Sequence, residues 1–195
     1  MSVPLLTVVV PTIGRPGLGA ALLSVRRQAP AAEVELLVVG DTHRGTYHQA
    51  LARVPHVCRT AGARYVEHDG GVHCYGQPQR QRGQAAARGH WLAWLQDDDL
   101  WEPDALAAIR PFFRYRRPLL FRAETRLGGT VWREPRLELG NVDANCLVVP
   151  NEPARLGRWG LSYNGDYDMI CETVAAWGDC AWPSPLIATH PGAHP

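Results

Sequence analysis

Lysine is absent from this chain of 195 residues, and all 20 of its basic residues are arginine. A phosphate-binding loop built on a lysine is therefore excluded. The 19 acidic residues leave a net charge of +1, so no global field attracts nucleic acid or an anionic membrane. No apolar run approaches the roughly 18 residues that a membrane-spanning helix needs, and we expect no transmembrane segment.

Paired cysteines are also missing. No Cys-x-x-Cys motif occurs, and an odd number of scattered cysteines suits a reducing cytoplasm better than a disulfide framework. The first residues carry no basic stretch and no cleavage site, so we expect no signal peptide. Together these absences predict a cytoplasmic location.

Apolar runs alternate with helical patterns through the first half of the chain. Short, largely apolar runs predict strands at 5–11, 34–41, 63–68 and 90–96. Helices are expected between them, over 15–28, 46–54 and 79–89, the last ended by Gly89. This alternation predicts an α/β fold, with a mainly parallel sheet and helices on both faces. The length and the lack of repeats or linkers predict a single domain over 1–195.

The pattern changes after residue 103. A helix is expected to start in the range 102–117 and to be broken or kinked by Pro111, and an amphipathic helix is expected over 166–178 that ends at Gly178. Strands are expected over 118–127, 129–139, 144–150 and 185–190. This half of the sequence indicates a mixed rather than a parallel arrangement.

The stretch "WLAWLQDDDLWEP", residues 91–103, ends an apolar run in three consecutive carboxylates. Adjacent carboxylates repel one another, so an ordinary fold gains nothing by gathering them. At the end of a strand they can instead bind Mg2+ or Mn2+, which prefer oxygen ligands. A solvated acidic turn is the alternative, which the apolar residues on both sides disfavour. Ligands bind outside the carboxyl ends of parallel strands, so these aspartates should share a crevice with the polar ends of the first two strands.

The same stretch resembles the strand and aspartate motif of family 2 glycosyltransferases, which have the GT-A fold. "QRQRGQAAARGHW" resembles the helix before that strand, "VVVPTIGRPGLGAALLSVRRQ" the first strand, loop and helix, and "ELLVVGDT" the second strand. The resemblance covers residues 5–103, and more loosely "NGDYDM" and "THPG". It implies a GT-A, Rossmann-like fold with a nucleotide-sugar-binding half at 1–103 and an acceptor-side half at 104–195.

Three positions depart from the family pattern. Gln96 stands where the family often has its first aspartate, Gln81 where it often has asparagine, and Gly40 in place of one acid of an Asp-Asp pair. The aspartate register is therefore open: either Asp97 and Asp99 or Asp98 and Asp99 form the working pair.

The resemblance implies roles for residues around the donor. Asp99 would ligate Mn2+ or Mg2+, with Asp98 or Asp97 on the metal or on the donor ribose. Arg80, and less surely Arg82, would add positive charge to the diphosphate, since arginine offers a fork suited to phosphate. A solvated helix face is the alternative for Arg80.

Further residues are expected around the nucleoside and the metal. Asp41 would accept a hydrogen bond from the base ring, with uridine the usual partner and thymidine possible; a simple turn is the alternative. Pro11, Thr12 and Arg15 would line the same nucleotide pocket. His190 in "IATHPG" would complete the metal site, unless it is an ordinary histidine beside a proline.

On the acceptor side, "SYNGDYDM" resembles the family's Glu-Asp pair at the start of a helix. Asp166 would be the general base, with Gly165 in the Glu position and Asp168 as the neighbouring alternative. A helix cap is the other interpretation of Asp166. Asp143 and Asn145 could contact a sugar or form a turn, and Tyr75 offers a stacking surface on a flap.

The hypothesis favoured by these residues is a metal-dependent, inverting glycosyltransferase that moves a sugar from a nucleotide-diphosphate donor, a UDP-sugar, to an acceptor hydroxyl. A nucleotidyltransferase shares the sheet and the metal aspartates, and a non-catalytic nucleotide-sugar-binding module would need no base. The acceptor stays open among a glycan, a natural product, a protein and a modified nucleic-acid base.

Overall fold

A six-stranded sheet forms the centre of the molecule, in the order β3-β2-β1-β4-β9-β6. The computed structural model describes residues 3–43, 48–124 and 129–191. Four strands run parallel, and these are β1 (Leu6–Thr12), β2 (Val34–Asp41), β3 (Arg64–His68) and β4 (Trp91–Trp94). The other two are β9 (Leu147–Pro150), which is antiparallel to both neighbours, and β6 (Leu119–Leu120).

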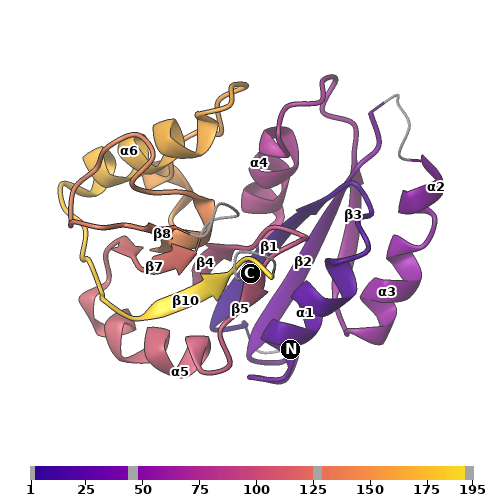
Figure 1. The fold of residues 1–195 in the computed structure, drawn as a ribbon, viewed down its shortest axis with the longest axis horizontal. Coiled ribbons are helices and arrows are strands. Elements are labelled where there is room, and N and C mark those ends of the chain that lie inside the picture. The colour runs from indigo at the N-terminus through magenta and orange to yellow at the C-terminus, as the bar shows by residue number, and fades with distance from the viewer. Residues whose placement is uncertain (1–2, 44–47, 125–128, 192–195) are drawn as a thin grey trace.

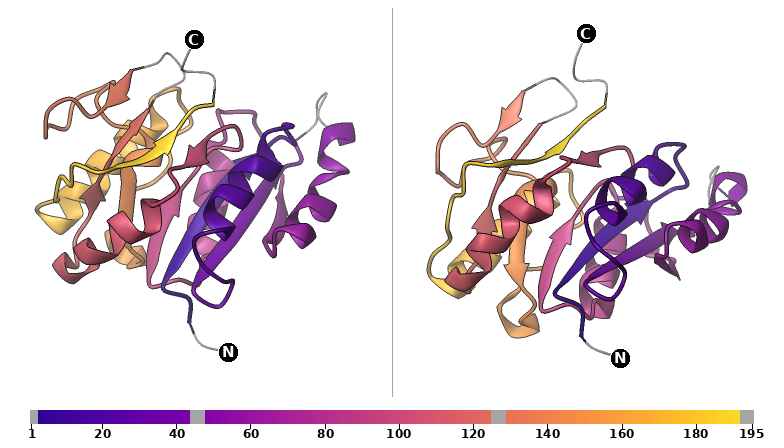
Figure 2. Two further views of the ribbon diagram at one scale, coloured as in Figure 1. Left: turned by 60° about the horizontal axis from the view of Figure 1, so that its bottom comes forward. Right: turned by 90° about the horizontal axis from the view of Figure 1, so that it is seen from below.

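Helices cover both faces of this sheet, and Figure 2 shows α1 (Leu18–Arg26) in front of it and α4 (Gln77–Ala86) behind it. Right-handed crossovers from β1 to β2 to β3 put α1 and α3 (Val54–Thr60) on one face. The connection from β3 to β4 puts α4 on the other face of the sheet. The strand order therefore reverses between β1 and β4, where open α/β sheets bind their ligands.

A smaller sheet lies beside the first, in the order β5-β10-β7-β8 (Figure 1). Its strands are β5 (Leu100–Trp101), β10 (Leu186–Thr189), β7 (Arg122–Glu124) and β8 (Thr130–Val131). The remaining elements are α2 (His48–Leu51), α5 (Ala105–Ile109), α6 (Gly165–Trp177) and the 3-10 helices η1 (Arg110–Tyr115), η2 (Ala144–Cys146) and η3 (Pro153–Arg155). The buried apolar side chains form one core that spans both sheets.

The α/β architecture with a parallel first part and a mixed second part confirms the predicted fold class. Several local predictions were wrong: residues 144–146 of one predicted strand form η2, and the strand predicted over 118–127 is divided into β6 and β7, which belong to different sheets. The helix expected over 79–89 ends at Ala86, and the next residue, Ala87, is already extended. Gly89 does not end this helix but packs against β1, because a Cβ there would lie 2.5 Å from the Thr7 backbone nitrogen. Gly89 thus lets the start of β4 approach β1.

The helix expected over 102–117 is interrupted near Pro111, as predicted: α5 ends at Ile109 and 3-10 geometry follows from Arg110, because Pro111 lacks the N–H that an α-helix needs. In the range 129–139 only Thr130–Val131 is a strand, and α3 was not anticipated. Residues 46–47 and 125–127, parts of a predicted helix and a predicted strand, lie outside the described residues. Within the described parts of the chain, no helix combines the length and apolar character needed to cross a membrane.

Candidate active site

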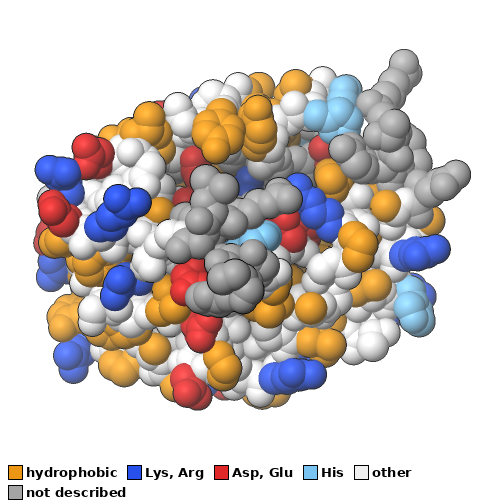
Figure 3. Space-filling view, viewed as in Figure 1, with side chains coloured by type: hydrophobic (Ala, Val, Ile, Leu, Met, Phe, Trp, Pro, Cys, Tyr) orange, Lys and Arg blue, Asp and Glu red, His pale blue; other side chains and the backbone are white. Residues whose placement is uncertain are grey.

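A cleft of about 540 Å³ opens at the carboxyl ends of β1, β2 and β4. Figure 3 shows the corresponding face of the molecule, where acidic, arginine and histidine side chains gather around a hollow. Six of the predicted site residues line the cleft: Pro11, Thr12, Arg15, Asp41, Arg80 and Asp97. The sheet topology produces this grouping, because parallel strands end at the same edge.

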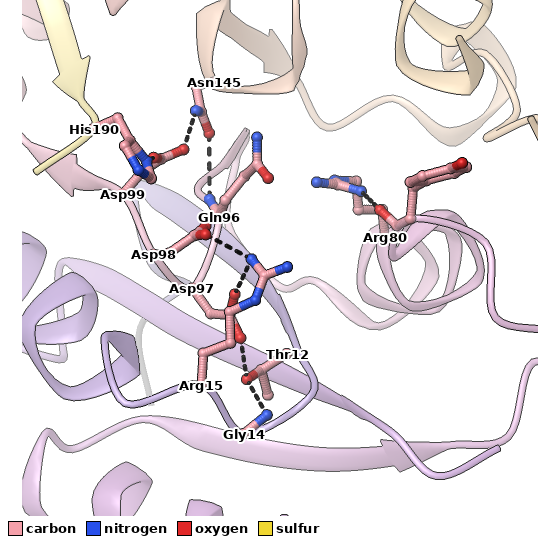
Figure 4. A network of polar contacts seen from close by, with 11 residues as sticks. Thr12, Gly14, Arg15, Arg80, Gln96, Asp97, Asp98, Asp99, Asn145 and His190 are labelled. Atoms are coloured by element: carbon pink, nitrogen blue, oxygen red, sulfur yellow. Dashed lines mark hydrogen bonds and ion pairs between the residues drawn. The ribbon is translucent and has the colours of Figure 1, made fainter. Parts of the chain in front are cut away.

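Of the three consecutive aspartates, Asp97 and Asp98 both contact Arg15, whose charge reduces their repulsion, whereas Asp99 points to other partners (Figure 4). Asp97 is buried and faces β1: the Thr12 hydroxyl donates to its Oδ2 at 2.6 Å, and the Thr12 oxygen accepts from the Gly14 N–H at 2.8 Å. Arg15 Nη1 lies 3.2 Å from Asp97 Oδ1 and 2.7 Å from Asp98 Oδ2. Burial nevertheless raises the pKa of Asp97, and the Thr12 hydrogen bond opposes that rise.

Asp99 turns away from Arg15 and toward the second half of the chain. His190 Nδ1, just after β10, lies 2.6 Å from Asp99 Oδ1, and Asn145 Nδ2, on η2, donates to Asp99 Oδ2 at 2.6 Å. Burial raises the pKa of Asp99, while both of these hydrogen bonds act against it. Asn145 Oδ1 also accepts from the Gln96 N–H at 3.3 Å, so η2 holds the turn that carries the aspartates.

Asp98, Asp99 and His190 bring one oxygen or nitrogen atom each within 4.8 Å of one another. Carboxylate oxygens and an imidazole nitrogen suit Mn2+ and Mg2+. The donor set therefore fits the divalent cation expected from the sequence. His190 lies more than 90 residues after the two aspartates in the sequence, and the fold brings it to them.

Arg80 is buried rather than on a solvated helix face, with 5% of its surface exposed. Its Nη1 donates to the Tyr75 carbonyl at 2.6 Å, and its guanidinium lies 5.4 Å from the centre of the Trp159 ring. Burial lowers its pKa, and the nearby carboxylates of Asp166 and Asp143 act in the opposite direction. Its side chain lines the cleft, so the guanidinium places a positive charge beside the space in which an anion could bind.

Arg82, the less favoured alternative, is exposed on the same helix and does not line the cleft. The spacing explains the difference, because residues two apart on a helix face different directions.

Asp166 and Asp143 are a second acidic group of the site, and their carboxylates interact with each other and with Arg80. Asp166 is half-buried on the first turn of α6, where its Oδ1 accepts from the Tyr167 N–H at 2.9 Å. Asp143 caps η2 by accepting from the Asn145 N–H at 2.8 Å, and burial together with the charge of Asp166 raises its pKa to about 6. Asp168 is exposed and lies near Gly160, away from this group.

Asp41 is buried at the end of β2 with both oxygens engaged. Its Oδ1 accepts from the His43 N–H at 3.0 Å, and its Oδ2 lies 2.9 Å from His73 Nδ1. The imidazole rings of His43 and His73 meet edge to face at 4.9 Å. His73 also lines the cleft but gave no signal in the sequence, because it stands in an irregular glycine-rich segment.

The family model described as "Glycosyl transferase family 2" matches residues 7–147. This chain belongs to glycosyltransferase family 2. The match includes β1, β2, the aspartate triplet and Asn145, and it stops before α6 and His190.

Solved structures share the fold of this family 2 glycosyltransferase. TarS of S. aureus aligns with a TM-score of 0.72 and 16% identity over 94% of this chain and 36% of that one. TarS 1-349 in complex with UDP-GlcNAc aligns with a TM-score of 0.66 and 17% identity over 94% of this chain and 57% of that one. Glucosyl-3-phosphoglycerate synthase from Mycobacterium tuberculosis, in complex with phosphoglyceric acid, aligns with a TM-score of 0.69 and 14% identity over 96% of this chain and 72% of that one. The chain thus spans about a third of the full TarS length, and a search of curated proteins found no match.

Proposed function

We propose that this family 2 glycosyltransferase moves a sugar from a UDP-sugar to an acceptor hydroxyl, with a divalent cation and with inversion at the anomeric carbon. One observation carries the proposal. The cleft runs from Asp41 to Asp97, and the group of Asp98, Asp99 and His190 adjoins its Asp97 end. A nucleoside at Asp41 and a diphosphate near the triplet would match these two ends.

In this proposal each residue has one task. Asp41 accepts the ring N–H of uracil, Asp97 with Thr12 and Arg15 holds the ribose side, and Asp98, Asp99 and His190 hold Mn2+ or Mg2+. The bound cation would neutralise charge on the departing diphosphate. Related structures support this choice of ligands, since the mycobacterial synthase was solved with Mn2+, UDP and glucosyl-3-phosphoglycerate.

Arg80 would add a second positive charge to the leaving diphosphate, because it lines the cleft and its burial favours a strong charged hydrogen bond. Asp166 would accept the proton of the acceptor hydroxyl from the face opposite the diphosphate. Displacement from that face in one step inverts the anomeric carbon. A retaining reaction needs a different route, such as a covalent intermediate.

Calorimetry with UDP, CDP and GDP, each with Mn2+ and with EDTA, tests the donor site. Selective binding of UDP that weakens in EDTA supports the proposal, and a preference for GDP would make Asp41 a bystander. Turnover of UDP-glucose, UDP-galactose and UDP-GlcNAc with mixed acceptors, followed by mass spectrometry, tests catalysis. A non-catalytic binding module would bind UDP without turnover.

The cytoplasmic location stays a prediction, with which the five free cysteines agree.

A further inference from the structure

Two exposed tyrosines stand at the mouth of the cleft and have no role in the chemistry described above. Tyr75 is 68% exposed and Tyr163 is 75% exposed, although both rings are large and partly apolar. Their centroids lie 5.2 Å apart and their planes meet at 83°. Figure 3 shows hydrophobic side chains gathered at the upper rim of the hollow, in the region between α4 and α6. We call Tyr75 and Tyr163 together the tyrosine lip.

The lip joins the two halves of the chain. Tyr75 lines the cleft and precedes α4, whereas Tyr163 belongs to the loop that leads into α6, three residues before Asp166. Gln77 Nε2 donates to the Ser162 carbonyl at 3.4 Å and connects the two loops beneath the rings. The two rings therefore border the side of the cleft on which Asp166 lies.

The position of Tyr75 is maintained against a backbone preference. Its φ is +49°, a left-handed value that non-glycine residues adopt uncommonly and that costs of order 1 kcal/mol. The buried Arg80 holds this conformation by donating to the Tyr75 carbonyl at 2.6 Å. Such strain persists only where the surroundings enforce it, and it is concentrated at functional sites.

The charges around the lip favour a neutral ligand. Residues 70–76 contain no acidic or arginine residue, and residues 160–168 contain two aspartates and no basic residue. The nearby cation is Arg80, which is buried, interacts with Asp166 and is assigned to the donor diphosphate in the proposed function, so a phosphorylated or carboxylated acceptor would meet Asp166 without a cation of its own. Two perpendicular rings form a corner that offers one flat face and one edge, and a pyranose has a flat C–H face and a rim of hydroxyls.

We propose that the tyrosine lip binds the pyranose ring of a neutral carbohydrate acceptor, stacked on Tyr163 and steadied by Tyr75, with one hydroxyl directed at Asp166. This inference rests on the proposed function and specifies its acceptor class. An open-chain polyol has no rigid flat face for the corner to hold, and an anionic acceptor would compete with the donor diphosphate for Arg80.

Saturation-transfer NMR on the full chain, with and without UDP and Mn2+, tests the lip. The probes are methyl β-D-glucopyranoside and the methyl β-glycoside of N-acetylglucosamine, with sorbitol as an open-chain polyol and 3-phosphoglycerate as an anion. Tyr163→Ala and Tyr75→Ala should each weaken pyranoside binding about 5- to 10-fold, the scale of one lost ring contact. Tyr163→Phe should bind normally, because it keeps the ring. Leu161→Ala, which truncates a 65% exposed side chain on the same loop, should also bind normally.

Several results would overturn the proposal: unchanged pyranoside binding in both alanine variants, no pyranoside binding by the unmodified chain, or equal binding of sorbitol or 3-phosphoglycerate. A loss of UDP affinity in Tyr75→Ala as large as the loss for pyranosides would instead assign the lip to the donor. Failure of UDP binding with intact, tyrosine-dependent pyranoside binding would reject the proposed function and leave the lip supported.

Discussion

The two halves of the molecule build their parts of the site in different ways. In residues 1–103, most site residues follow the ends of buried parallel strands, and the sheet brings those ends to one edge. In residues 104–195 the strands are short, and the site residues lie on loops, a 3-10 helix and the first turn of α6. Regular strands thus make the donor side predictable, whereas the acceptor side depends on how loops pack.

The candidate metal site combines residues from both halves of the chain. Asp98 and Asp99 come from the first half, and His190 and Asn145 come from the second and approach Asp99 from β10 and η2. If the two halves work as proposed, substitutions at this junction should stop the reaction. Substitutions within one half should impair binding or catalysis separately.

The largest effect is expected at the junction. Asp99→Asn should lower turnover about 1,000-fold, because losing the cation removes several kcal/mol of charge stabilisation at about 1.4 kcal/mol per tenfold. Manganese titration of UDP-sugar turnover measures it, and EDTA should have the same effect on the unmodified chain. Asp104→Asn, at an exposed position before α5, is the control and should be active. Full activity of the unmodified chain in EDTA would contradict the metal assignment.

Asp166→Asn should separate catalysis from donor binding. Turnover should fall about 100-fold, the scale of losing a general base, while UDP affinity by calorimetry stays unchanged. Asp168→Asn is the matched control, because Asp168 is exposed two residues away and should leave turnover intact. NMR of the product should show the inverted anomer. A retained anomer, or normal turnover of Asp166→Asn, would reduce Asp166 to a helix cap.

Arg80→Lys should affect the donor side alone. UDP affinity should fall about tenfold, because lysine cannot reproduce the guanidinium fork, and one charged hydrogen bond contributes about 1.5–3 kcal/mol. Uridine, which has no phosphate, should bind both proteins equally. Arg82→Lys alters an exposed arginine on the same helix and should bind UDP normally. Equal weakening of uridine and UDP would show a disturbed cleft rather than a lost phosphate contact.

The smallest effect concerns stability in the acceptor half. Asp143 has a pKa of about 6 when folded and 3.8 as its reference value, so between these values the folded protein binds more protons than the unfolded chain. Stability therefore falls as pH rises through this window. Asp143→Asn removes that loss and keeps an oxygen for the Asn145 N–H.

Urea unfolding should show Asp143→Asn about 1 kcal/mol more stable than the unmodified chain near pH 8, with little difference near pH 4. Asp104→Asn serves as the exposed control. A variant destabilised at the higher pH and unchanged at the lower one would contradict the raised pKa of Asp143.

Packing explains two of the departures from the family pattern. At Gly40 a Cβ would lie 2.4 Å from the Tyr65 hydroxyl, so the ring of Tyr65 fills the space where an acid could stand. At Gly165 a Cβ would lie 2.1 Å from the Gly160 carbonyl, which leaves no room for a glutamate before Asp166. Gly40 follows from a residue 25 positions away, and Gly165 from the fold of the loop that begins at Gly160, and neither contact is indicated by strand or helix periodicity.

Local patterns in the chain were enough to predict the strands β1 to β4, the end-of-strand positions of Asp41 and the aspartate triplet, and the helix that begins near Asp166. Strand and helix periodicity, and the rule that parallel strands end together, act over short stretches of sequence. The family resemblance indicated His190 for the metal site, but only the folded molecule buried Arg80 beside Trp159, brought Asn145 to Asp99, placed His73 on Asp41 and paired Tyr75 with Tyr163. These contacts join residues from separate loops and elements, and they depend on packing between side chains that periodicity does not encode.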